Sequence, residues 1–89
     1  MILEVLKVDG VKKNTAQLFK SLRKKNGLSQ AELAEKLNVS RITIQNMEAA
    51  QNVTIDTFLK ALKHFHLLDK FNDFTSVKIE NTKIPSLYK

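Results

Sequence analysis

Apolar side chains recur at helical spacing through the middle of the chain. Leu33 and Leu37 belong to one such stripe, and Ile44 and Met47 belong to the next. Side chains three or four residues apart lie on one face of a helix, so each stripe predicts a short amphipathic helix. Only residues 38–40 separate the two helices that these stripes predict. The pattern therefore predicts two short helices joined by a tight turn.

Residues that can cap helix ends indicate where the helices begin. In Ser29-Gln30-Ala31-Glu32 the serine hydroxyl can accept from the glutamate amide while the glutamate reaches back, which is the capping-box pattern. Ser40 and Thr54 are placed to cap two further helices. Together, the caps and the apolar stripes predict helices over about residues 30–37, 41–49 and 55–65.

The flanking segments are expected to add one helix on either side. The first starts near Asn14 or Thr15, either of which can cap it, and runs to about Asn26. Gly27 stops it, because glycine readily takes the left-handed conformation that ends helices. A short fifth helix is expected over residues 67–74.

Alternating apolar and polar residues suggest a strand near each end. Residues 1–8 alternate loosely before an Asp9-Gly10 turn, and residues 77–80 alternate again. The expected fold class is all-α, with five helices and short terminal β-strands. The chain then divides into an N-terminal strand or arm, a helical domain and a C-terminal tail: residues 1–13, 14–74 and 75–89.

Positive charge is concentrated in one segment. Fifteen Lys and Arg against nine Asp and Glu give a formal net charge of +6. Residues 11–26 hold six basic side chains and no acidic one, so they account for the whole excess. Such a block indicates a polyanionic partner, either nucleic acid or an anionic membrane surface, unless it is simply a solvated helix face.

Several classes of protein are excluded by composition. With 89 residues there is room for one small domain, and the absence of cysteine excludes disulfides, thiolate zinc sites and thiol nucleophiles. The apolar opening is too short and too charged for a signal peptide or a membrane span. We expect a cytoplasmic protein that does not engage a membrane.

Catalytic and metal-binding patterns are also missing. The sequence has no Gly-rich phosphate loop and no Ser/His/Asp set. His64 and His66 are two residues apart, which places them on different faces of a helix, with no third ligand nearby. We therefore expect no catalytic residue, no metal site, no cofactor and no enzymatic activity.

The second central helix has an outer face suited to reading bases. Arg41 can pair bidentately with guanine, and Gln45 and Asn46 can pair with adenine. Ile42 cannot hydrogen-bond but can pack on a thymine methyl group. Two helices joined by a short turn form a helix-turn-helix, in which the second helix enters the major groove of double-stranded DNA.

Other side chains are placed to contact phosphates. Gln30 and Ser40 stand at helix starts, where amide, hydroxyl and backbone N–H groups suit phosphate oxygens. Lys24 and Lys25 of the basic block are expected to contact phosphates as well. Because one recognition helix covers few base pairs, we expect a homodimer on a palindromic operator, with half-sites about one helical turn apart.

Residues 27–48 resemble the helix-turn-helix of the Cro/CI (Xre) repressors, and the similarity extends over about residues 15–74. The resemblance implies a five-helix, lambda-repressor-like DNA-binding domain with the base-facing and phosphate-facing positions named above. It also implies that Arg23 pairs with Glu48 and so ties the first helix to the recognition helix. One departure is Asn38, where a glycine is common in the family.

A narrower resemblance lies downstream. Residues 54–62 and 67–71, followed by residues 84–87, are similar to HipB-type regulators. This implies an autoregulating antitoxin that represses its own promoter and binds a HipA-type kinase toxin. Two alternatives fit the same residues: a toxin-binding module with weak DNA binding, and a phage-type repressor without a toxin partner. The C-terminal tail is then a dimer strand or a partner-docking segment, or else a frayed terminus.

Overall fold

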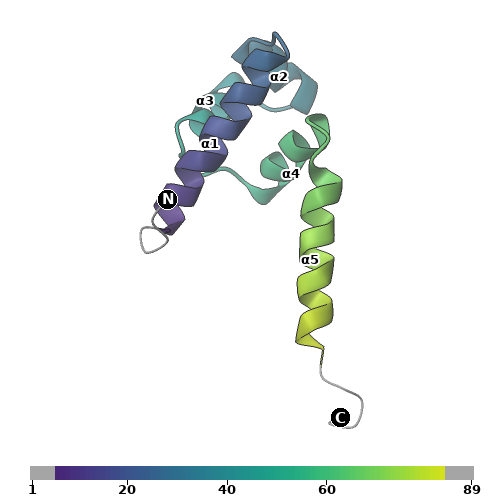
Figure 1. Cartoon of the computed structure of the whole chain (residues 1–89). Helices are drawn as coiled ribbons and strands as arrows, with labels where there is room; N and C mark the ends of the chain where they lie inside the picture. Colours follow the sequence, from purple (N-terminus) through teal and green to yellow (C-terminus); the bar gives the residue numbers. More distant parts are fainter. Residues whose placement is uncertain (1–5, 84–89) are drawn as a thin grey trace.

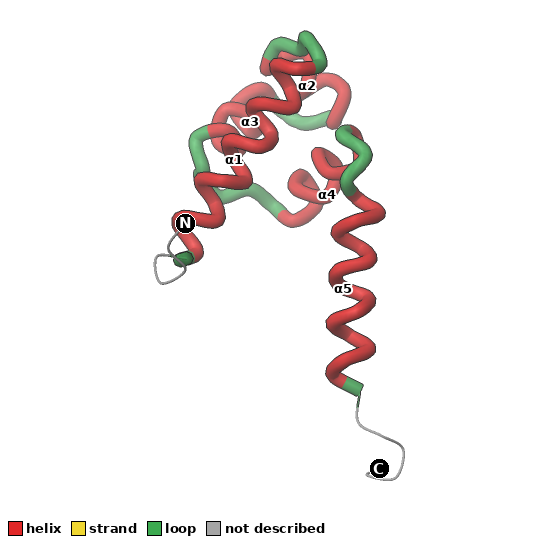
Figure 2. Tube along the Cα trace, in the orientation of Figure 1, coloured by secondary structure: helices red, strands yellow, loops and turns green. Residues whose placement is uncertain are grey.

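Five helices follow one another in the computed structural model, which describes residues 6–83 (Figures 1 and 2). They are α1 (Val8–Lys25), α2 (Gln30–Leu37), α3 (Arg41–Glu48), α4 (Ile55–His64) and α5 (Leu68–Thr82). Within residues 6–83 no strand is present. The all-α, five-helix expectation is therefore confirmed for this part of the chain, and the short terminal strands are not seen.

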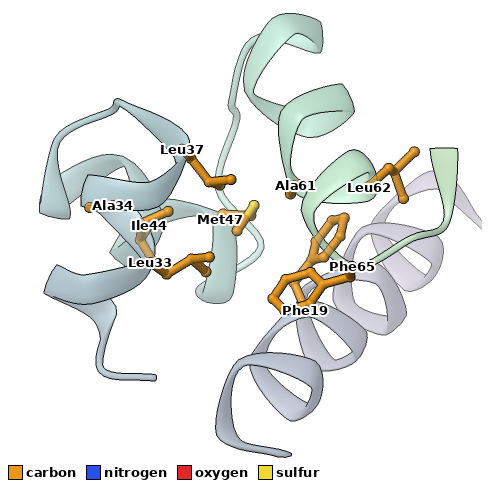
Figure 3. Packing of buried hydrophobic residues seen from close by; sticks show 9 residues of the cluster. All are labelled: Phe19, Leu33, Ala34, Leu37, Ile44, Met47, Ala61, Leu62 and Phe65. Carbon is orange, nitrogen blue, oxygen red and sulfur yellow. The ribbon is translucent and has the colours of Figure 1, made fainter. Parts of the chain in front are cut away.

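The core lies between α1, α2, α3 and α4. Phe19, Leu33 and Ile44 are fully buried there, each from a different helix. Figure 3 shows the cluster, with side chains from α2 and α3 facing those of α1 and α4. The stripes recognised in the sequence are the buried faces, so the periodicity correctly identified the inner side of each central helix. The other core members are Ala34, Leu37, Met47, Ala61, Leu62 and Phe65.

A chain of aromatic rings connects α1 to α5. The ring centroid of Phe19 lies 6.3 Å from that of Phe65 and 5.9 Å from that of Phe58. Phe58 in turn meets Phe71 of α5 edge to face at 5.6 Å. Such separations are typical of favourable aromatic pairs. The first half of α5 is thereby attached to α4, whereas its second half projects away from the other helices (Figure 1).

The predicted N-terminal caps of α2, α3 and α4 are confirmed. The Ser29 hydroxyl accepts from the Glu32 amide at 3.0 Å, and the Glu32 carboxylate accepts from the Ser29 amide at 2.8 Å, completing the capping box. Ser40 accepts from the Thr43 amide and Thr54 from the Thr57 amide, each at 3.1 Å. Each bond satisfies a backbone donor that a helix leaves free in its first turn.

The start of α1 corrects the expectation of a strand, a turn and a later helix. The helix begins at Val8 rather than near Asn14 or Thr15, and it includes Asp9 and Gly10. Steps of three or four residues along the chain from Val8 lead to Ala16 and Phe19, which are buried. Asp9 lies in the first turn, where a negative charge stabilises the helix dipole. Of the expected strand, residues 1–5 lie outside the described residues.

The C-terminal half of α5 lies where a second strand was expected, so that expectation is wrong. Residues 77–80 are helical, and α5 continues to Thr82 instead of ending near Phe74. Four alternating residues are compatible with the period of a strand and with that of a helix. No glycine or proline interrupts the chain between Leu28 and Ile84, so nothing in the sequence ends the helix earlier. A helix satisfies its own backbone groups, whereas a strand here would need a partner. The similarity noted at residues 84–87 lies outside the described residues.

The candidate DNA-binding surface

The recognition surface is built by α2 and α3. Three residues, 38–40, join the two helices, and the side chains that pack between them are Leu33, Leu37, Ile44 and Met47. Asn38 has φ 57° and ψ 48°, the left-handed conformation that ends α2. Asparagine tolerates that conformation better than most residues, so the departure from glycine does not disturb the turn.

The exposed face of α3 carries all four expected base-contacting residues. Arg41, Gln45 and Asn46 are exposed, and so is Ile42, of which 65% is accessible. The opposite face holds Ile44 and Met47 in the core, so the outward orientation of the other side chains is fixed by packing. An exposed isoleucine between polar groups suits contact with a thymine methyl group in a groove.

The two helix-start residues proposed for phosphate contact differ in their surroundings. Ser40 is exposed, and its hydroxyl lies 2.9 Å from the Thr43 hydroxyl in addition to capping α3. Gln30 is half-buried, and its Nε2 donates to Glu48 Oε1 at 3.1 Å. An amide carries two donor hydrogens, so Gln30 retains one N–H for a phosphate while the other holds Glu48.

The expected pair between Arg23 and Glu48 is present and connects three helices. Arg23 Nε and Nη2 donate to the two carboxylate oxygens at 2.5 and 2.9 Å, and Nη1 donates to the Leu28 carbonyl at 2.8 Å. The two side chains are 10% and 4% exposed. With Gln30 on the same carboxylate, the end of α1, the start of α2 and the end of α3 are held at one point.

The charges of this pair are mutually stabilised. The hydrogen bond to Glu48 raises the pKa of Arg23 above its ordinary value. Burial alone would raise the pKa of Glu48, but the hydrogen bonds from Arg23 and Gln30 and the arginine charge outweigh burial, and the pKa is lowered. Both groups are therefore charged at neutral pH, and the pair fixes the position of α3.

The basic block divides into two parts along α1. Lys24 and Lys25 are exposed in the last turn, next to the start of α2. Lys12 lies near the other end of α1, about 18 Å away along the helix axis, at 1.5 Å per residue, and its Nζ donates to Asn52 Oδ1 at 2.9 Å. Of these three lysines, only Lys24 and Lys25 adjoin the start of α2, as expected for phosphate contacts beside a recognition helix.

Asn52, in the loop between α3 and α4, is a polar residue of this surface that the sequence pattern does not indicate. It borders a hollow of about 410 Å³ that is also lined by Asn46 of α3 and Thr54 at the start of α4. Lys12 holds the asparagine in place from α1. The only signal in the sequence is a polar residue two positions before a helix cap, which is too common to single out.

The described residues contain neither a cluster of metal-ligating side chains nor a helix that could span a membrane. No group of three or more metal-ligating side chains occurs among residues 6–83. In the same range, no helix has both the length and the apolar character needed to cross a membrane.

Comparison with known proteins identifies the family of the chain. The helix-turn-helix family profile matches residues 19–67, from the middle of α1 through α4. Antitoxin HipB of Escherichia coli strain K12 is 34% identical over 73 residues, covering 81% of this chain and 83% of that protein. Antitoxin HipB of Escherichia coli O6:H1 strain CFT073 is 38% identical over 53 residues, covering 58% and 56%. No solved structure matches significantly.

Proposed function

The chain belongs to the Cro/CI-type helix-turn-helix family, and from this we propose that it is a sequence-specific double-stranded DNA-binding repressor that acts as an antitoxin. The observation that carries the proposal is the exposed face of α3. Arg41, Gln45 and Asn46 stand on a helix whose other face is locked into the core, which is what reading base edges requires.

DNA binding follows from the surroundings of α3. The helix is preceded by a three-residue turn and anchored at its end by Arg23 and Gln30, so its position in the domain is fixed. Lys24, Lys25 and Ser40 supply phosphate contacts that set the register without reading sequence. The base contacts then determine which operator is bound.

A homodimer on a palindromic operator is part of the proposal. One short α3 reaches only a few base pairs, whereas two copies related by a twofold axis read two half-sites. Exposed apolar residues on α5, among them Phe74 and Val77, supply surface for such an assembly. Repression would then result from occupation of the promoter by the dimer.

The antitoxin role rests on similarity to two proteins named antitoxin HipB. By that similarity, the partner is a HipA-type kinase toxin, bound by this chain while the dimer holds its operator. Co-expression of the chain with the neighbouring gene's product tests this role. Relief of growth arrest and co-purification are expected, and a phage-type repressor would give neither.

The DNA-binding proposal is tested by fluorescence anisotropy. A labelled duplex from upstream of the gene is compared with a scrambled duplex over a series of salt concentrations. Specific complexes are typically at least about 10³-fold tighter than non-specific ones, so a gap of that order is expected. Equal, steeply salt-dependent binding to both duplexes would show that charge alone acts, and would favour a toxin-binding module with weak DNA binding.

A further inference from the structure

Exposed apolar side chains border a groove away from the exposed face of the recognition helix. It lies between the start of α1, the α3–α4 loop and the start of α4, and is here called the α1–α4 groove. The exposed apolar residues that line it are Leu6, Val8, Val11 and Ile55. A contiguous apolar patch of this kind marks an interaction surface on a small protein.

The α1–α4 groove is mainly apolar and carries positive charge. Its volume is about 650 Å³, and Phe19, Met47 and Phe58 contribute to its lining. Lys7 and Lys12 line it as well, and none of the described residues that line it is acidic. A matching occupant therefore presents several apolar side chains together with a carboxylate.

The chain enters α1 at the groove itself. Leu6 and Lys7 both line the groove, and Lys7, the N-cap residue, is extended, with φ −124° and ψ 163°. Residues 1–5 are therefore joined to the chain at the lining of the groove. The groove follows α1 from Val8 to Phe19, which is about 16 Å at 1.5 Å per residue. Five extended residues span up to about 17 Å, which is enough to cover that length.

Residues 1–5 have the chemistry that the groove requires. Their sequence is Met1-Ile2-Leu3-Glu4-Val5, four apolar residues and one acid. Leaving four apolar side chains in water is costly. The Glu4 carboxylate has a partner in Lys12, whose ammonium group keeps two donor hydrogens besides the one given to Asn52.

The segment after α5 does not match the groove in the same way. Residues 84–89 contain apolar side chains too, but they carry Lys89 and no acid. They follow the far end of the projecting α5, whereas residues 1–5 adjoin the groove (Figure 1). A covalently attached segment also acts at an effective concentration in the millimolar range, which a separate chain does not reach at ordinary protein concentrations.

We propose that residues 1–5 lie in the α1–α4 groove of their own chain, with their apolar side chains on its lining and Glu4 facing Lys12. Asn52 and Thr54 of the groove also line the hollow beside Asn46. The segment thereby packs against the loop that adjoins the recognition helix. This interaction surface does not depend on the proposed DNA-binding role.

The test uses disulfide formation, because the chain has no cysteine of its own. Leu3→Cys is combined with Ile55→Cys across the groove, and Ile2→Cys is combined with Ile55→Cys in a second variant. Adjacent residues of an extended chain point to opposite sides, so one of the two faces the groove. The control combines Leu3→Cys with Lys13→Cys, since Lys13 is exposed on α1 and does not line the groove.

Each pair is equilibrated with reduced and oxidised glutathione, and the effective concentration of one thiol at the other is measured. At least one groove pair should exceed the control pair by about tenfold or more, because docking holds the two thiols together. In an undocked segment the control pair would be favoured, because its cysteines are closer in sequence.

Stability gives an independent measurement on chains without cysteine. Leu3→Ala should lower the melting temperature, because the side chain is buried in the groove, whereas Lys13→Ala should leave it unchanged. The losses from Leu3→Ala and Ile55→Ala should add to more than the loss of the double variant, since the two side chains share one contact region.

Two outcomes overturn the proposal. Groove pairs with no higher effective concentration than the control pair, together with an unchanged melting temperature for Leu3→Ala, would show that the segment does not dock. A disulfide-linked dimer as the main product, identified by mass under non-reducing conditions, would place the segment in the groove of a second copy. Neither measurement involves DNA, so this inference and the DNA-binding proposal can fail independently.

Discussion

At the scale of single residues, the buried Arg23–Glu48 ion pair is the feature whose charges are most costly to remove from water. Two charged side chains are almost completely buried, and each carboxylate oxygen accepts at least one hydrogen bond. Taking charges out of water is costly, so such a pair contributes to stability only while both members are present. Its position at the end of α3 makes the recognition helix depend on it.

Removing one member of the pair should destabilise the fold strongly. Glu48→Gln leaves the Arg23 charge buried without its counter-ion and should cost about 3 kcal/mol in free energy of unfolding, measured by urea denaturation. The double variant Arg23→Met/Glu48→Leu should recover much of that loss, because no unpaired charge is left. A single variant as stable as the wild type would contradict the role assigned to the pair.

Stability should also fall in acid through the same carboxylate. The folded-state pKa of Glu48 is lowered from its ordinary value of 4.5, so its contribution is complete above that value and is lost as the pH falls through the lowered pKa. Thermal melts at decreasing pH should show a smaller acid loss for Glu48→Gln than for the wild type. Glu32→Gln is the comparison, since the Ser29 amide lowers the pKa of that exposed carboxyl too.

Substituting a base-contacting residue should affect DNA binding differently from substituting a phosphate-contacting residue. Asn46→Ala should cost about 1–3 kcal/mol on the operator and relax specificity at one position. Lys24→Ala should weaken operator and scrambled duplex alike and reduce the slope of log affinity against log salt by about 1. Anisotropy titrations separate the two effects, and an equal loss on both duplexes for Asn46→Ala would contradict base reading.

At the scale of elements, four helices end with the chain in the left-handed conformation. The residues are Gly27, Asn38, Ala50 and His66, with φ between 57° and 71°. In all four the amide of the residue that follows donates to a carbonyl of the helix: Leu28 to Arg23, Val39 to Ala34, Gln51 to Asn46 and Leu67 to Leu62. Alanine is the least suited of the four, because its Cβ is strained where φ is positive.

Ala50→Gly should therefore stabilise the protein. Relieving the strain at φ 60° should outweigh the added freedom of the unfolded chain and raise the free energy of unfolding by roughly 0.5–1 kcal/mol. Ala49→Gly is the matched control, because its φ of −96° suits alanine and that substitution should destabilise. A lower stability for Ala50→Gly would refute the strained end of α3.

The central elements could be predicted from sequence because several local signals agree there. Ser29 and Glu32 cap α2 by contacts within four residues, and the buried stripe has one clear period. The ends of the chain lack that agreement. Asp9-Gly10 suits a turn as well as a first helical turn, and the structure places both residues in the first turn of α1. Gln30 on Glu48 and Asn52 on Lys12 depend on tertiary contacts that spacing does not reveal.

At the scale of the whole molecule, the shape is extended for its size. The radius of gyration is 16.1 Å, against about 12 Å expected for a compact chain of this length. The projecting α5 accounts for the extension, with most of its apolar residues exposed (Figure 1). The exposed apolar residues leave surface for the proposed homodimer, which is why dimerisation and DNA binding are proposed together.

If the protein binds as a dimer, its affinity for the operator should depend on the spacing of the half-sites. Inserting about 5 bp between them rotates one half-site to the opposite face of the duplex, so the affinity of the dimer should fall to that of a single half-site. Inserting about 10 bp returns the half-sites to the same face and should restore part of the loss. Electrophoretic mobility shifts with such duplexes measure this, and indifference to spacing would indicate independent monomers.

The central claim is that α3 reads DNA sequence as one half of a twofold-symmetric pair. Selection of bound duplexes from a randomised library tests it most directly, because the protein itself then picks its operator from all sequences. The wild type should enrich an inverted repeat with half-sites about one helical turn apart, and Asn46→Ala should lose preference at one position in each half. Recovery of unrelated sequences with no common repeat would contradict the account.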